Sequence, residues 1–109
     1  MSSPHTEVRV PGGKLVRQIH FYGATAANGD LTLVDTYDGT LSVSRSTNQY
    51  TFTLPFPFRK VLSTIATSGT ATAFAGTRGA ESGTARTVRI DFAATLASTQ
   101  MNGVITVEI

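Results

Sequence analysis

The chain contains no cysteine among its 109 residues. Disulfide bonds and thiolate metal sites are therefore excluded. Small secreted domains often depend on disulfide bonds, so this absence favours synthesis in the cytosol or support from an oligomer. Charge is scarce as well, because Asp, Glu, Lys and Arg make up only 15% of the residues. Threonine and serine supply the polar surface instead, which suits exposed strands and also suits a surface that another protein covers.

Long apolar runs and clustered charges are also missing. No window approaches the roughly 20 apolar residues of a transmembrane helix, and the first residues, MSSPHTEVRV, lack the apolar segment of a signal peptide. The net charge is +2, but the 9 Lys and Arg residues are scattered along the chain. Without a basic run, binding to nucleic acid is not expected. We therefore predict a protein with no membrane partner and no nucleic-acid partner.

The most regular pattern lies in the segment 40–62, TLSVSRSTNQYTFTLPFPFRKVL. Apolar residues recur there at every second position in two runs: Leu41 and Val43, then Tyr50, Phe52 and Leu54. Strict alternation of this kind is typical of a half-buried strand. The polar residues 46–48 between the runs suit a hairpin loop. The segment therefore predicts an antiparallel hairpin.

A corner rich in proline follows this hairpin. Pro55 and Pro57 cannot donate backbone hydrogen bonds to a sheet, so they end the second strand. Phe56 and Phe58 have two interpretations: they close the core of the fold, or they anchor an interface with Arg59 beside them. One phenylalanine can also serve each role.

Further short strands are predicted along the rest of the chain, separated by turn residues. They cover residues 15–22, 31–36, 61–67, 86–92 and 103–109, and residues 70–75 also alternate. Roughly seven to nine strands at this spacing indicate an all-β fold, a single antiparallel β-sandwich that is jelly-roll-like or immunoglobulin-like.

Two segments of the chain do not read as strands. Residues 76–85 carry three glycines and little apolar mass, so we expect a long exposed loop or flap. Residues 93–102 are the one segment that can hold a helical turn, with Leu96 and Met101 closing an end of the core.

Residues 1–14 are predicted to form an extended N-terminal arm, and residues 15–109 the β-sandwich domain. Within the arm, only residues 6–10 alternate, with Val8 and Val10 on one side. This segment is an edge strand of its own domain, an extension that pairs with a neighbour by strand addition, or a partly ordered tail.

Chemical machinery is not evident. His5 and His20 are the only histidines, no GxSxG-like turn supports a catalytic triad, and a zinc site needs three or four ligands. Asp35 and Asp38 flank a turn where calcium is an alternative, although no dense DxDxD pattern supports it. The glycine loop 76–79 lacks the ending of a phosphate-binding loop. We therefore predict a protein that is not an enzyme and has no catalytic residues, cofactor or metal site.

The segment GTLSVSRSTNQYTFTLPFPFRKVLSTIA resembles the small β-sandwich capsid decoration, or cementing, proteins of tailed bacteriophages. The shared features are an x-V-x-R-x strand, a Y-x-V/F-T-L strand, a proline or aromatic corner and an L-L-x-x-x-A strand. Here these are residues 42–46, 50–54, 55–58 and 61–66, and the closing strands 88–92 and 104–109 also fit. The resemblance covers roughly the last two-thirds of the chain. Members of this group carry a more elaborate N-terminal region than this chain does.

The resemblance implies a virion structural protein, made in the host cytoplasm and placed on the outer capsid surface. It implies binding at joints between major capsid protein subunits, with a homo-oligomer or neighbouring copies on the shell as further partners. We expect contacts with neighbours through Val8 and Val10 of the arm and through Phe56, Phe58 and Arg59 of the corner.

An alternative function is a phage fibre or tail-tip domain that binds host surface glycans. Such a domain needs exposed aromatic platforms, for which Tyr22, Tyr37 and Tyr50 are the candidates.

Overall fold

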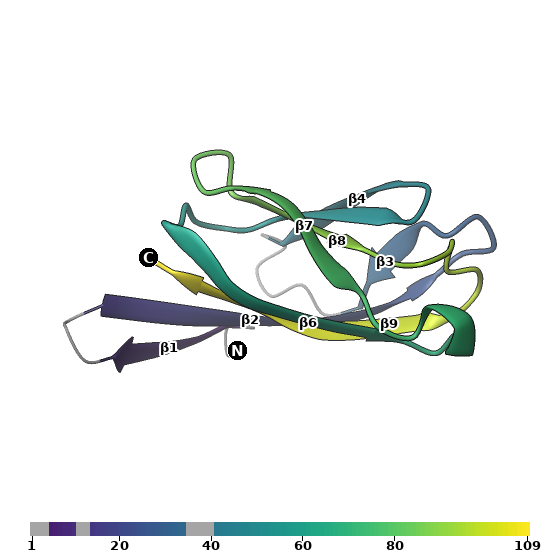
Figure 1. The fold of residues 1–109 in the computed structure, drawn as a ribbon, viewed down its shortest axis with the longest axis horizontal. Coiled ribbons are helices and arrows are strands. Elements are labelled where there is room, and N and C mark those ends of the chain that lie inside the picture. Colours follow the sequence, from purple (N-terminus) through teal and green to yellow (C-terminus); the bar gives the residue numbers. More distant parts are fainter. Residues whose placement is uncertain (1–4, 11–13, 35–40) are drawn as a thin grey trace.

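The computed structural model describes residues 5–10, 14–34 and 41–109. Two antiparallel sheets pack face to face (Figure 1), so the predicted all-β sandwich is confirmed. Within the described ranges, no helix is long and apolar enough to cross a membrane.

The first sheet holds the longest strands of the molecule. Its order is β1 (His5–Val10), β2 (Lys14–Thr25), β9 (Gln100–Glu108) and β6 (Lys60–Ser68). The short strand β3 (Leu31–Leu33) pairs with the last residues of β2. Every pairing in this sheet is antiparallel.

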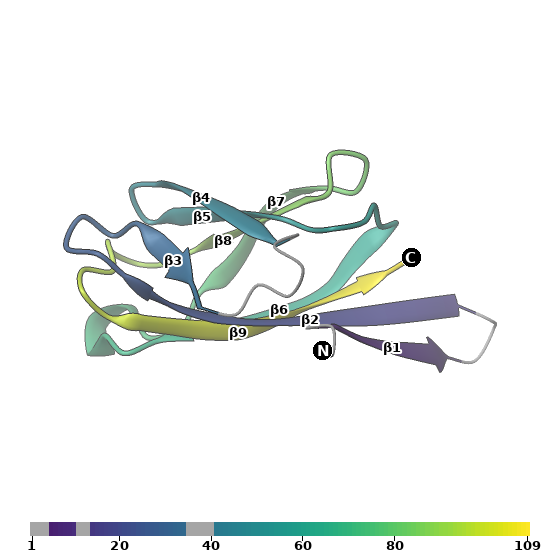
Figure 2. The same cartoon turned by 180° about the vertical axis from the view of Figure 1, so that it is seen from behind.

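The second sheet has the order β4 (Ser42–Ser46), β5 (Gln49–Thr53), β8 (Thr87–Asp91) and β7 (Thr77–Ser82). The strands β4 and β5 form the predicted hairpin, joined by the turn at 47–48. The chain then crosses between the sheets from β5 to β6, from β6 to β7 and from β8 to β9. These crossings bring the first long strand, β2, beside the last strand, β9 (Figure 2).

The core lies between the sheets and follows the predicted alternation. Side chains of the second sheet and its margins that are 0% exposed are Tyr50, Phe52, Leu54, Val88 and Ile90. The buried side chains of the first sheet that face them are Ile19, Phe21, Ile105 and Val107. The rings of Phe21 and Phe52 lie 4.4 Å apart between centroids and join the two layers. Leu96 and Met101 are also buried, so their predicted place in the core is confirmed.

Three local expectations were wrong. Residues 77–82 form the edge strand β7 instead of a loop, because an edge strand needs backbone hydrogen bonds to β8 and no buried side chain. Residues 71–73 form a short 3-10 helix, η2 (Ala71–Ala73), where alternation was read. Residues 93–99 hold bends and irregular segments and no helix.

The N-terminal segment forms a hairpin within its own chain. β1 pairs with β2 from His5 opposite Ile19 to Val10 opposite Lys14, so it is an edge strand of the first sheet. The β1–β2 hairpin extends beyond the rest of the sandwich along its long axis (Figures 1 and 2). Of the three alternatives for this segment, the chain therefore adopts the edge strand.

Candidate functional site

One end of the sandwich, called the hairpin end below, gathers segments that are far apart in the sequence. It holds the β1–β2 hairpin, the corner 54–59, the turn 83–86 and the C-terminus (Figure 2). Backbone hydrogen bonds connect these segments: Leu54 N to Arg86 O (2.7 Å), Arg59 N to Glu108 O (2.6 Å) and Ile109 N to Leu15 O (2.9 Å). The corner is therefore fixed to the strands that carry the hairpin.

The corner residues divide between core and surface. Phe58 is 8% exposed and packs in the core, which agrees with the first of its two interpretations. Phe56 is half-buried, and the guanidinium carbon of Arg17 lies 4.5 Å from the centre of its ring. Arg59 is exposed. Arg59 therefore lies at the surface, whereas Phe56 is partly buried and packs against the core that contains Phe58.

The register of the first sheet places the arm and the corner at the same end of the molecule, on opposite edges of that sheet. Val8 is paired with Val16, and Val10 with Lys14. One row of paired residues runs across β1, β2, β9 and β6 through Val8, Val16, Glu108 and Lys60. Because Lys60 directly follows the corner, the two groups of predicted contact residues lie at the same end of the molecule.

Exposed charge at the hairpin end is mainly positive among the described side chains, with Glu81, two residues before the turn 83–86, as an exposed acid. Arg59, Lys60 and Arg86 are exposed, whereas Glu108 is 6% exposed. A positive rim of this kind favours encounter with an acidic protein surface and weakens as salt rises.

A second candidate surface, called the Tyr22 face below, lies on the outer side of the first sheet. Two rows of paired residues define it: Tyr22, Asn102 and Thr67, then His20, Val104 and Ile65. Tyr22 and Ile65 are 53% and 59% exposed. Two open hollows of about 380 and 310 Å³ meet at Tyr22 and Asn102, both of which line each of them.

The three tyrosines proposed as aromatic platforms differ in where the structure places them and in whether it describes them. Tyr22 is exposed as that interpretation requires. Tyr50 is 0% exposed, so its place among the exposed platforms was wrong: its strand turns it into the core. Tyr37 lies outside the described residues.

The neighbours of Tyr22 could not be identified from the sequence. His20 is exposed on the same strand as Tyr22 and is paired with Val104. Val104 and Ile65 come to this face through the pairing of β9 with β2 and β6, and a register between distant strands is not readable from one sequence.

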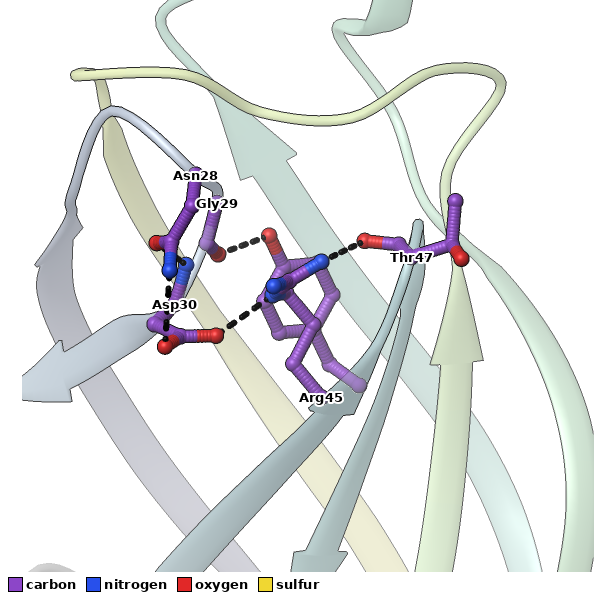
Figure 3. A network of polar contacts seen from close by, with 6 residues as sticks. Asn28, Gly29, Asp30, Arg45 and Thr47 are labelled. Atoms are coloured by element: carbon purple, nitrogen blue, oxygen red, sulfur yellow. Dashed lines mark hydrogen bonds and ion pairs between the residues drawn. The ribbon is translucent and has the colours of Figure 1, made fainter.

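A network of polar contacts at the opposite end has a structural role (Figure 3). Arg45 donates from Nε to Asp30 Oδ1 (2.6 Å) and from an Nη to the carbonyl of Thr47 (2.9 Å). Asn28 donates to the other carboxylate oxygen of Asp30 (3.2 Å). The hydrogen bond from Arg45, and then that from Asn28, lower the pKa of Asp30 below its ordinary value of 3.8. The polar groups of the network bond to one another, and they connect the turn 26–30 to the β4–β5 hairpin.

The buried phenol of Tyr50 belongs to the same junction. Its hydroxyl donates to the carbonyl of Gly29 (2.6 Å). Burial raises the pKa of Tyr50 above its ordinary value of 10.0. This hydrogen bond joins the two sheets at the end remote from the hairpin.

Metal binding finds no support in the described ranges 5–10, 14–34 and 41–109, where no group of three or more His, Asp or Glu side chains is placed to hold an ion. Asp35 and Asp38, the alternative calcium ligands, lie outside those ranges.

Comparison with known proteins gave no match: no family model, no curated protein and no solved structure matches the chain.

Proposed function

We propose that this chain is a non-enzymatic virion structural protein that decorates and stabilises the capsid of a tailed bacteriophage. In this proposal the hairpin end binds at joints between major capsid protein subunits on the outer surface of the shell. Further copies of the chain occupy equivalent sites around it.

The observation that carries the proposal is that the arm and the corner lie at the same end of the molecule. These two segments were selected from the sequence as contacts with neighbours, and they are separated by more than forty residues. The row through Val8, Val16, Glu108 and Lys60 connects the two segments across the sheet, with buried Val16 and Glu108 between them and exposed Arg59 and Lys60 at the corner. A contact surface built from several segments is rigid, so less entropy is lost when it binds.

The position of β1 adds a second support. It is the edge strand of the first sheet, so its outer side offers backbone donors and acceptors to a further strand. Strand addition of this kind supplies affinity through main-chain hydrogen bonds. Many copies on one lattice then stabilise the shell, since each copy binds the assembled state in preference to free subunits.

Sedimentation with phage heads that lack this protein tests the proposal. We expect saturable co-sedimentation of the chain with the heads, and heads that resist a higher temperature once saturated. Absence of saturable binding, together with a stable free oligomer, would contradict it and favour the fibre or tail-tip alternative.

A pair of matched variants locates the contact. Arg59→Gln with Lys60→Gln removes two positive charges from the hairpin end, and both residues are exposed. Ala93→Glu with Ala94→Glu changes the net charge by the same amount beside the β4–β5 turn, where Phe92 N donates to Asn48 O. We expect about tenfold weaker binding to heads from the first variant, and little change from the second.

A further inference from the structure

The Tyr22 face is an ordered surface, and no other described segment of the chain covers it. Tyr22 lies on β2, paired with Asn102 of β9, and its carbonyl accepts a hydrogen bond from Val34 N (2.9 Å). The side chains of the face project from three paired antiparallel strands, β2, β9 and β6. The positions of its side chains are therefore fixed by sheet pairing, as a binding site requires.

Hydrogen-bonding groups on this face are unused by the protein. Among the described residues, no hydrogen bond involves the side chains of His20, Tyr22 or Gln100, all of which are exposed. Asn102 accepts from the Thr67 hydroxyl through its amide oxygen (2.8 Å), so its amide NH2 group points to no partner in the protein. Each of these groups can donate to a ligand or accept from it.

The hollows beside Tyr22 have the size and openness for a small part of a larger ligand. Their volumes of about 380 and 310 Å³ fall at the lower end of the range of roughly 300–1,000 Å³ for small-molecule sites. They share the edge formed by Tyr22 and Asn102, so a chain of two or more rings can lie across both.

The lining of both hollows contains no Asp, Glu, Lys or Arg. It consists of aromatic and aliphatic side chains together with imidazole, amide and hydroxyl groups. An anionic ligand would meet no Lys or Arg here, and a cationic ligand would meet no carboxylate. A neutral ligand that presents both C–H faces and many hydroxyl groups matches this chemistry.

From these observations we infer that the Tyr22 face is a binding site for a neutral saccharide. The phenol ring of Tyr22 and the side chain of Ile65 pack against the C–H face of a pyranose ring. The imidazole of His20 and the amides of Asn102 and Gln100 hydrogen-bond to its hydroxyl groups. A protein partner is disfavoured because the polar groups on this face are set around hollows, and not on the rim of a flat apolar patch.

The site is separate from the hairpin end. Tyr22 is six residues from Val16 along β2, or roughly 20 Å at about 3.3 Å per residue. Saccharide binding is therefore measured on the free chain and does not depend on the capsid proposal.

The test uses the full chain in solution. An array of neutral oligosaccharides that spans hexoses, N-acetylhexosamines and deoxyhexoses is screened beside sialylated and uronic-acid counterparts. The best neutral binder is then titrated into isotope-labelled protein by NMR. We expect amide shifts confined to residues 20–24, 65–67 and 100–104, and weaker binding of the acidic counterparts.

Three variants connect the binding to the face. Tyr22→Ala should weaken binding about tenfold because the ring is lost, whereas Tyr22→Phe should stay within about threefold. Phe74→Ala is the matched control, since Phe74 is 59% exposed and lines neither hollow. Melting temperatures confirm that each variant is folded.

The inference is overturned if no neutral saccharide on the array binds, if the shifts lie elsewhere, or if Tyr22→Ala binds as the wild type does. Preferential binding of acidic saccharides would contradict the assignment to a neutral ligand. Recognition of this face by a protein alone would also overturn it.

Discussion

Substitution of Tyr50 by phenylalanine tests the junction between the two sheets. The side chain is 0% exposed, and its hydroxyl donates to the carbonyl of Gly29 at 2.6 Å. Gly29 itself is buried, with a φ of 100° in the turn 26–30. Tyr50→Phe keeps the ring and its edge-to-face contact with Phe92, but it leaves this carbonyl without a donor.

The expected loss follows from that unpaired group. A buried acceptor left without its partner costs about 1–3 kcal/mol. For a domain of roughly this size, 1 kcal/mol corresponds to about 4–8 °C in melting temperature. We therefore expect Tyr50→Phe to lower the free energy of unfolding by about 2 kcal/mol and the melting temperature by about 10 °C.

Urea denaturation and thermal melts measure both quantities, with Tyr22→Phe as the matched control. The Tyr22 hydroxyl is exposed and makes no hydrogen bond to the described chain, so that control should stay within about 0.5 kcal/mol of the wild type. Equal stability of Tyr50→Phe and Tyr22→Phe would refute the assigned role of the Gly29 contact.

The same substitution should change the response to alkali. Burial raises the pKa of Tyr50, so the unfolded chain releases this proton at a lower pH than the folded chain. Stability from this group is complete below the unfolded value of 10.0 and is lost as the pH rises through the folded value. Tyr50→Phe should lack this component of alkaline unfolding, and an identical alkaline midpoint would contradict the assignment.

Further substitutions test other parts of the fold. Gly103→Ala places a Cβ about 2.1 Å from the carbonyl oxygen of Ile65, so we expect loss of more than about 2 kcal/mol in urea denaturation, and wild-type stability would show that β6 and β9 are not held this closely. Leu96→Ala removes a side chain that is 0% exposed and should cost about 2–5 kcal/mol, whereas a neutral effect would place Leu96 outside the core. For Asp30, whose pKa is lowered chiefly by the hydrogen bond from Arg45, stability is present above the unfolded value of 3.8 and is lost as the pH falls through the folded value. Asp30→Asn should therefore unfold with a shallower acid dependence, and an unchanged acid profile would exclude this contribution.

The alternation of apolar residues predicted the two-layer fold. Tyr50, Phe52 and Leu54 read as one face of a strand, and all three are 0% exposed. The pattern is reliable there because the sandwich buries only one face of β5. Apolar and polar side chains must therefore alternate along the strand. The hairpin turn at 47–48 was readable from its polar residues.

The edge of the second sheet was not predictable in the same way. Five of the six residues of β7 are exposed and the sixth is Gly79, so no alternation marks the strand. Its pairing with β8 shifts register between Arg78 and Glu81, and Arg78 crosses to the carbonyl of Val61 at 2.8 Å. Backbone pairing and one long side chain hold this strand, and neither leaves a periodic signal in the sequence.

The candidate surfaces were predicted only in part. Arg59 and Phe56 were identified because a proline-fixed corner is unusual, and Tyr22 was one of the three tyrosines named as candidate aromatic platforms. Their neighbours depend on the register of β2, β9 and β6, which is set by packing across the whole sheet. Tyr50 is the opposite case, because the alternation in its strand already placed its side chain on the face that is buried in the core.

Protection of single cysteines tests the orientation of the bound protein most directly. Because the chain has no cysteine, Arg59→Cys and Ala93→Cys each introduce one unique thiol, at the hairpin end and at the opposite end. The rate of modification by a maleimide is measured for the free protein and for the protein bound to phage heads. We expect binding to slow modification of Arg59→Cys at least about tenfold and to leave Ala93→Cys unchanged. Equal rates for free and bound Arg59→Cys, or protection of Ala93→Cys instead, would contradict attachment through the hairpin end.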